Sequence, residues 1–179
     1  MPIEILIEFL KDVEPNYADR KFSKVSLELP PIPHVAIGAV DLLEYIKGKD
    51  GELLALIIRR GFSDEGVNFV TSPENFLQVG ILNHQQGSKI KPHQHKEKPK
   101  TINYTQEVLH LEYGKVEAVF YQNNQAIKKC LLFEGDTIIL LGGGHGFNIL
   151  EDTKMIEIKQ GPYLSQAEDK VLLEIKEEY

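Results

Sequence analysis

The sequence is poor in the features that mark secreted and membrane proteins. Cys130 is its single cysteine, so an intramolecular disulfide framework is excluded and a reducing compartment fits. No apolar run approaches the roughly 18–20 residues that a membrane-spanning helix needs. The first ten residues carry acids where a signal peptide would carry bases. We therefore expect a cytoplasmic protein without a membrane partner.

Positive charge is also scarce. The 179 residues include 20 lysines and arginines against 27 aspartates and glutamates, which gives a formal net charge of −7. A chain of this sign is a poor general binder of nucleic acid, and no nucleic-acid partner is expected. With 42% hydrophobic and 26% charged residues, the composition is that of a folded domain with a real core.

Short apolar segments separated by polar turns dominate the chain after residue 50. Spacings of about 8–12 residues between such strands are typical of an all-β barrel or sandwich, which we assign to residues 51–165. A tight hairpin is expected at Gly114-Lys115, between the two strands that flank it, and the next turn at Asn123-Asn124. The predicted strands are Leu53–Ile58, Phe76–Leu82, Val108–Tyr113, Val116–Tyr121, Ile127–Phe133, Thr137–Leu141, Phe147–Leu150 and Met155–Ile158.

The two ends of the chain differ from this pattern. Residues 1–50 are mixed, and we interpret them as an extension that packs on the barrel. Val40–Lys47 has helical spacing, with Leu43 and Ile46 on one side and Gly48 as a plausible stop, so a short helix is predicted there. Residues 166–179 form a charged tail, either strand or helix.

Two histidines separated by one residue carry the strongest chemical signal. In an extended strand, side chains at i and i+2 point to the same face, so His93 and His95 would present two imidazoles to one point. A third histidine, His145, follows Gly142-Gly143-Gly144, where the absence of side chains would let the backbone approach closely. By contrast, His110 is out of phase with its neighbours and should face away from a pocket that Glu107 faces.

The order of these residues resembles the motifs of the cupin superfamily. Its first motif runs from a glycine through His-x-His and a glutamate to a second glycine, as do Gly87, His93, His95, Glu107 and Gly114 here. Its second motif begins with glycine and ends with a histidine and an asparagine, and the stretch from Gly135 to His145 and Asn148 is similar. The gap of eleven residues between His95 and Glu107 is longer than is usual in the family.

The resemblance implies a double-stranded β-helix, or jelly-roll barrel, that holds a divalent transition metal. Carried over by position, the metal ligands would be His93, His95, Glu107 and His145, with Glu97 as the alternative carboxylate. Three imidazoles and a carboxylate suit Fe, Mn, Ni or Zn and leave positions open for substrate. A homodimer is also implied by the resemblance alone.

Five lysines crowd the histidine pair in this acidic chain. Lys89, Lys91, Lys96, Lys98 and Lys100 are either a solvated loop or a lid that attracts an anionic substrate. Tyr104, on the approach to Glu107, is a candidate catalytic acid opposite a histidine base.

These features favour a metal-dependent enzyme that acts on a small anionic or sugar-type metabolite. The chemistry would be that of a dioxygenase or an isomerase. The alternatives are a non-catalytic cupin that binds or senses a sugar or acid, and a metal-free protein that resembles sugar-nucleotide isomerases.

Overall fold

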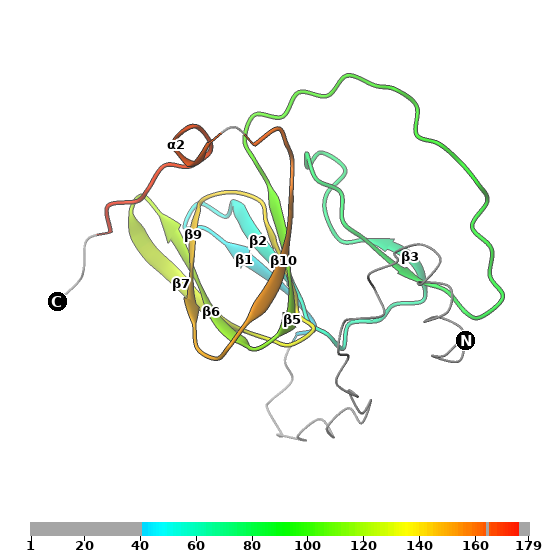
Figure 1. Ribbon diagram of the computed structural model, residues 1–179, viewed down its shortest axis with the longest axis horizontal. Helices are drawn as coiled ribbons and strands as arrows, with labels where there is room; N and C mark the ends of the chain where they lie inside the picture. The colour runs from blue at the N-terminus through cyan, green and yellow to red at the C-terminus, as the bar shows by residue number, and fades with distance from the viewer. Residues whose placement is uncertain (1–40, 164, 176–179) are drawn as a thin grey trace, which may run out of the picture. The chain divides into compact units, whose positions relative to one another are not determined.

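The computed structural model describes residues 41–163 and 165–175, and their regular secondary structure consists almost entirely of antiparallel strands (Figure 1). Contacts between Cα atoms divide the chain into Met1–Gly38 and Ala39–Tyr179, and every described residue belongs to the second unit. The elements are β1 (Leu43–Lys47), β2 (Leu53–Ile58), β3 (Gly66–Phe69), β4 (Gly80–Asn83), β5 (Glu107–Tyr113), β6 (Lys115–Gln122), β7 (Gln125–Phe133), β8 (Thr137–Leu140), β9 (Gly144–Ile149), β10 (Lys154–Lys159) and α2 (Gln166–Asp169).

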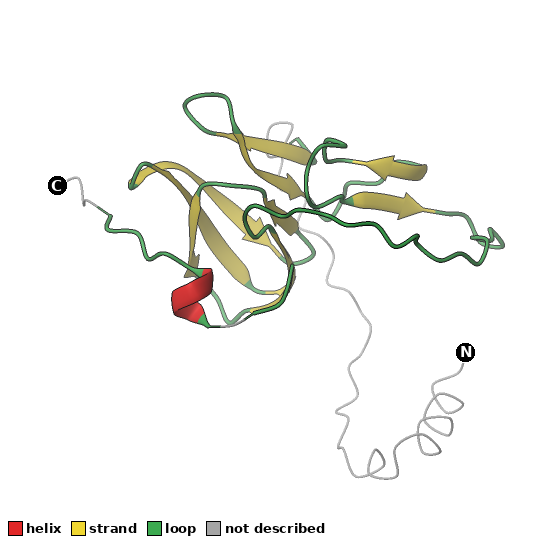
Figure 2. Cartoon of the chain, turned by 90° about the horizontal axis from the view of Figure 1, so that it is seen from above, coloured by secondary structure: helices red, strands yellow, loops and turns green. Residues whose placement is uncertain are grey.

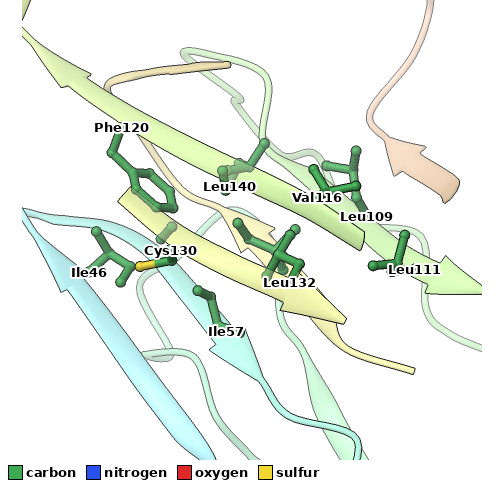
Figure 3. Packing of buried hydrophobic residues seen from close by; sticks show 12 residues of the cluster. Ile46, Ile57, Leu109, Leu111, Val116, Phe120, Cys130, Leu132 and Leu140 are labelled. Carbon is green, nitrogen blue, oxygen red and sulfur yellow. The ribbon is translucent and has the colours of Figure 1, made fainter. Parts of the chain in front are cut away.

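Two sheets pack face to face around one core. The first has the strand order β1-β2-β8-β5-β10, and the second has the order β7-β6-β9. Side chains from both sheets interdigitate between them, as Figure 3 shows for Ile57 and Leu109 of the first sheet and Phe120 and Leu132 of the second. Burial of these side chains supplies the main stabilisation of the fold.

The middle of the first sheet is buried on both faces. Leu54, Ala55, Leu56 and Ile57 of β2 are all at most 1% exposed, so this strand has no solvent face. A second apolar cluster around Leu56 explains it, since partly buried side chains from residues 62–81 cover the outer side of the sheet. The uninterrupted apolar run of β2 is what such a position requires.

The hairpin predicted at Gly114-Lys115 is wrong, because β5 and β6 do not pair and the chain passes from one sheet to the other at Gly114. Gly114 has a φ of +98°, and a Cβ there would lie 2.4 Å from the carbonyl oxygen of Asp152. Only glycine satisfies both conditions. Asn123 and Asn124 have φ values of 53° and 61°, and they form the predicted turn between β6 and β7.

The prediction of an all-β fold is confirmed. The described strands form three separate sheets, because β3 and β4 pair only with each other, and no closed barrel is present among them. Figure 2 shows the strands in yellow, with α2 as the one helix drawn in the described residues. No helix in residues 41–163 and 165–175 is long and apolar enough to cross a membrane.

The helix predicted at Val40–Lys47 is wrong where the structure describes it. Leu43–Lys47 is a strand that pairs antiparallel with β2, and Ile46 lies opposite Ala55 with no exposed surface. Pairing with an apolar strand outweighs the weak helical spacing of the segment. The sheet therefore begins before residue 51, where the barrel was expected to start.

Two further predictions were wrong in detail. Within Phe76–Leu82 the strand is confined to the end, as β4, and no strand was predicted where β3 forms. In the described part of the tail, only α2 is helical, and residues 170–175 have no regular structure. The predictions for residues 1–40 lie outside the described residues.

Candidate functional site

A cavity of about 880 Å³ opens between β5, β9 and the C-terminal segment. Its wall combines aromatic and aliphatic side chains with a few charged groups. The apolar part includes Leu109, Tyr121, Leu140, Phe147 and Leu173, and the polar part includes Tyr104, Glu107, His145, Glu157, Asp169 and Lys170. A largely apolar cavity of this size with converging polar groups is typical of small-molecule sites.

Glu107 is the buried acid of this cavity. It begins β5 opposite Leu140 of β8, on the face that also carries Leu109, and it is 6% exposed. The preceding residue holds it in place, because the buried side chain of Gln106 accepts a hydrogen bond from the Leu77 amide and donates one to the Leu141 carbonyl. A carboxylate is thereby fixed at the junction of several chain segments.

His145 approaches Glu107 from the other sheet. It lies on β9 opposite Phe120 of β6, and its Nε2 is 3.4 Å from a carboxylate oxygen of Glu107. Its ring packs at a tilt against Phe147, with the centroids 5.8 Å apart. Burial lowers the pKa of His145, although the negative charge of Glu107 opposes that shift. The imidazole is therefore held in its neutral form near pH 7.

Two ammonium groups lie close to the carboxylate of this pair. The Nζ atoms of Lys159 and Lys170 lie 3.8 and 3.9 Å from the second oxygen of Glu107. Lys159 is also paired with Asp169 at 3.0 Å, and both of these side chains are largely buried. The end of β10 and the end of α2 are thus joined beside the acid.

The glycines before His145 do what the sequence indicated. All three of Gly142–Gly144 line the cavity, and Gly143 has a φ of +67°. A Cβ on Gly144 would lie 2.4 Å from the Leu173 side chain and 3.1 Å from that of Tyr121. The backbone therefore passes close to its neighbours at this point, as the glycines allow.

Of the four predicted metal ligands, the structure brings together Glu107 and His145 but not the histidine pair. His93 and His95 are exposed and lie in the connection of residues 84–106, which contains no strand, so the same-face argument does not apply to them. Their rings are edge to face, with centroids 5.5 Å apart. Glu97 is exposed in the same connection. Within the described residues, no three His, Cys, Asp or Glu side chains lie close enough to hold a metal ion.

The five lysines of that connection do not cover the cavity. All five are exposed, and the described lining of the cavity includes none of them. The connection contributes Tyr104 instead, a half-exposed side chain at the cavity whose ring packs edge to face on Phe76 at 5.3 Å. His110 faces away from the cavity, as expected, and its Nδ1 is 3.0 Å from the Thr137 hydroxyl.

Sequence reasoning missed the part of the site that the tail supplies. Asp169, Lys170 and Leu173 all line the cavity, although the tail had no assigned role. The signal was present in Val171-Leu-Leu-Glu-Ile175, an apolar group inside a charged segment that has to find a partner surface.

Comparison with known proteins adds no relative: no protein-family model matches the chain, and neither the curated proteins nor the solved structures give a match.

Proposed function

We propose that the protein acts on a small anionic or sugar-type metabolite in this cavity by proton transfer between Glu107, His145 and the substrate. The observation that carries the proposal is the 3.4 Å approach of a buried carboxylate to an imidazole at the wall of an 880 Å³ cavity. Carboxylate and imidazole groups placed in this way commonly act as general acids and bases in enzymes.

The roles follow from the surroundings of the two groups. The neutral imidazole of His145 takes a proton from a carbon next to a carbonyl, and the electron pair moves onto the carbonyl oxygen. Glu107 stabilises the imidazolium that forms, because its charge lies beside the ring. The Tyr104 hydroxyl protonates that oxygen. The proton then returns from His145 to the former carbonyl carbon. At the same time the hydroxyl group carried by the first carbon gives its proton to the Tyr104 phenolate and becomes the new carbonyl, which completes an isomerisation.

The composition of the wall limits the substrate. Lys159 and Lys170 stand beside the pair and suit a carboxylate or phosphate group. The remaining carboxylates, Glu157 and Asp169, accept hydrogen bonds from hydroxyl groups, and Tyr121 and Phe147 offer apolar faces. A polyhydroxylated acid or a phosphorylated sugar carries a bonding partner for each of these groups.

The direct test is exchange of substrate hydrogen for deuterium. The protein is incubated in D₂O with a panel of sugar phosphates, sugar nucleotides and hydroxy acids, and incorporation is followed by NMR. We expect incorporation at one carbon with the wild type and none with Glu107→Gln or His145→Gln. His110→Gln, which changes a histidine on the opposite face of β5, is the matched control and should keep the exchange. Exchange that persists in both site variants would refute the proposal.

A cupin metal centre is the second candidate. It is favoured by the motif order and by the convergence of Glu107 with His145, two of its four expected ligands. The jelly-roll form of the cupin family would suit two facing sheets. In the described part of the chain, no hydrogen bond joins residues 86–103 to another element, so little holds His93 and His95 where they lie. Fe, Mn, Ni or Zn held by His93, His95, Glu107 and His145 would supply a Lewis acid or a dioxygen-binding centre.

Metal analysis separates the two candidates. The protein is purified without added metal and its metal content is measured by mass spectrometry, beside His93→Ala and the control His110→Ala. One equivalent in the wild type and in His110→Ala, lost in His93→Ala, would support the metal centre. If the wild-type protein contains no metal and still exchanges deuterium, only the proposal of acid–base catalysis by Glu107 and His145 would remain.

A binding or sensing protein without turnover is the remaining alternative. It predicts that members of the same panel raise the melting temperature while no hydrogen is exchanged. A cytoplasmic homodimer stays part of the proposal, and light scattering after size exclusion would test the dimer.

A further inference from the structure

The C-terminal segment of residues 170–175, which we call the strap, continues the chain from the end of α2 (Figure 1). Five of its six residues line the cavity, namely Lys170, Val171, Leu172, Leu173 and Ile175. The first residue of the strap lies beside Glu107, because the Lys170 ammonium is 3.9 Å from the Glu107 carboxylate. The strap is therefore part of the wall that any ligand has to pass or displace.

One side chain of the strap is seated in the wall. Leu173 lies against Gly144, at a place where a Cβ on the glycine would be 2.4 Å from the leucine Cδ1. Gly144 is the residue before His145. The missing side chain of the glycine thus provides the seat for Leu173. Because successive residues of a strand point to opposite faces, this seat lies on the face of β9 that carries Gly144, and the His145 imidazole lies on the other face.

The middle of the strap is loosely attached. Val171 and Leu172 are 88% and 79% exposed, whereas Leu173 and Ile175 are 38% and 39% exposed. In the described residues, no hydrogen bond holds the strap beyond Lys170 to another part of the chain. Segments with few buried contacts and few hydrogen bonds open at low free-energy cost.

The base of the strap is held far better. The Lys170 amide donates a hydrogen bond to the Gln166 carbonyl at 2.9 Å, and Asp169 is paired with the largely buried ammonium of Lys159 at 3.0 Å. Firm attachment up to residue 170 and weak attachment after it place a hinge at this point.

We propose that the strap gates the cavity, and that Leu173 in its seat on Gly144 holds the gate closed. In the closed state the strap restricts access to His145, and in the open state it swings about residue 170 and exposes the acid–base pair. The gate does not depend on the proposed function, because it concerns access to the cavity whether or not chemistry follows.

Chemical modification of His145 measures the gate without knowledge of the ligand. The full-length protein is treated with diethyl pyrocarbonate at pH 7, and the rate at each histidine is read by peptide mass mapping. We expect Leu173→Ala to accelerate modification of His145 several-fold, because the open population rises. Leu172→Ala, the same change at the exposed neighbour, is the matched control and should leave that rate as in the wild type.

A second pair of variants and an internal reference complete the test. Leu173→Asp places a charge in an apolar seat and should accelerate His145 more than Leu173→Ala does, whereas Leu172→Asp should not. The rate at His110, outside the cavity, reports general loosening of the fold. Equal rates at His145 in the wild type and both Leu173 variants would overturn the gate. An equal acceleration at His110 would overturn it as well.

Discussion

Two buried carboxylates in this chain are surrounded in opposite ways. Asp136, 4% exposed, is held by the Arg59 guanidinium at 2.8 Å and accepts hydrogen bonds of 3.0 Å from the backbone amides of Arg60 and Phe133. Glu107, 6% exposed, has its nearest charged or imidazole partners at 3.4, 3.8 and 3.9 Å. Burial is similar, but only Asp136 is closely and fully paired.

The difference separates a structural acid from a functional one. A buried charge is tolerated when short hydrogen bonds replace its hydration, and Asp136 meets this condition at the turn before β8. Glu107 has cationic neighbours at longer range and a cavity on one side, so a ligand can still reach it. Buried ionisable groups with incomplete pairing are the ones expected at functional sites.

The largest effect is expected for Asp136→Asn. The change removes the charge that pairs with Arg59, whose side chain is only 14% exposed, and it weakens the bonds to two backbone amides. Breaking one partner of a buried ion pair costs about 3 kcal/mol of stability. Urea unfolding followed by circular dichroism would measure the loss, and a loss below about 1 kcal/mol would show that Asp136 is not structural.

Glu107→Gln should leave stability almost unchanged. The variant loses attractions at 3.4–3.9 Å, but it also loses the cost of burying a charge, and these two effects nearly cancel. The same urea experiment should give a change within about 1 kcal/mol of the wild type. A destabilisation as large as that of Asp136→Asn would remove the contrast between the two acids.

A smaller effect is expected from Glu44, the second carboxylate on Arg59. Burial alone would raise the pKa of Glu44, but hydrogen bonds and charges from Lys128 and Arg59 outweigh it and lower the pKa below 4.5. The folded protein therefore binds this proton less readily, and the resulting stability is present above the unfolded pKa and lost as pH falls through the folded one. Glu44→Gln should lose about 0.5 kcal/mol at neutral pH, because the pair is partly exposed.

The acid limb of the pH profile is the measurement for this variant. Stability measured between neutral pH and the range below 4.5 should fall less steeply for Glu44→Gln than for the wild type. Parallel profiles would contradict the assignment.

The last prediction concerns the titration of His145. The negative charge of Glu107 raises the pKa of His145 against the larger effect of burial. Glu107→Gln should therefore lower the pKa of His145 further, and NMR titration of the ring proton would show it. The ring signals of His110, which is bonded to Thr137 away from the cavity, serve as the internal reference in the same spectra.

Periodicity predicted most of the fold because the signal for a strand is local. Apolar alternation located β5 to β10 to within a few residues, and the Asn123–Asn124 turn followed from side-chain chemistry. The hairpin expected at Gly114 is instead a passage between the two sheets. Ile46 shows where this fails. Its segment has helical spacing, and only the presence of β2 as a partner makes it a strand.

The site was half predictable for a similar reason. The motif order indicates Glu107, at the start of a strand, and His145, which follows a run of glycines, and the structure brings these two side chains together. The tail could not be placed, because Leu173 is recognised as part of the wall only once Gly144 is beside it. The role of Asp136 could not be predicted, because its ion pair with Arg59 joins residues 77 positions apart.

The acid and the imidazole come from different sheets, so their separation measures how the two sheets are set against each other. The spacer is the hydrophobic core itself, in which Leu140 lies opposite Glu107 in the strand register and Phe120 lies opposite His145. A core substitution that brings the two sheets closer together or shifts one sheet along the other would change the 3.4 Å distance between Glu107 and His145 without touching either residue. Substitutions in the core would thus change the reactivity of the pair. Among related proteins, we expect the distance between the acid and the imidazole to be conserved more strictly than the identities of the core residues.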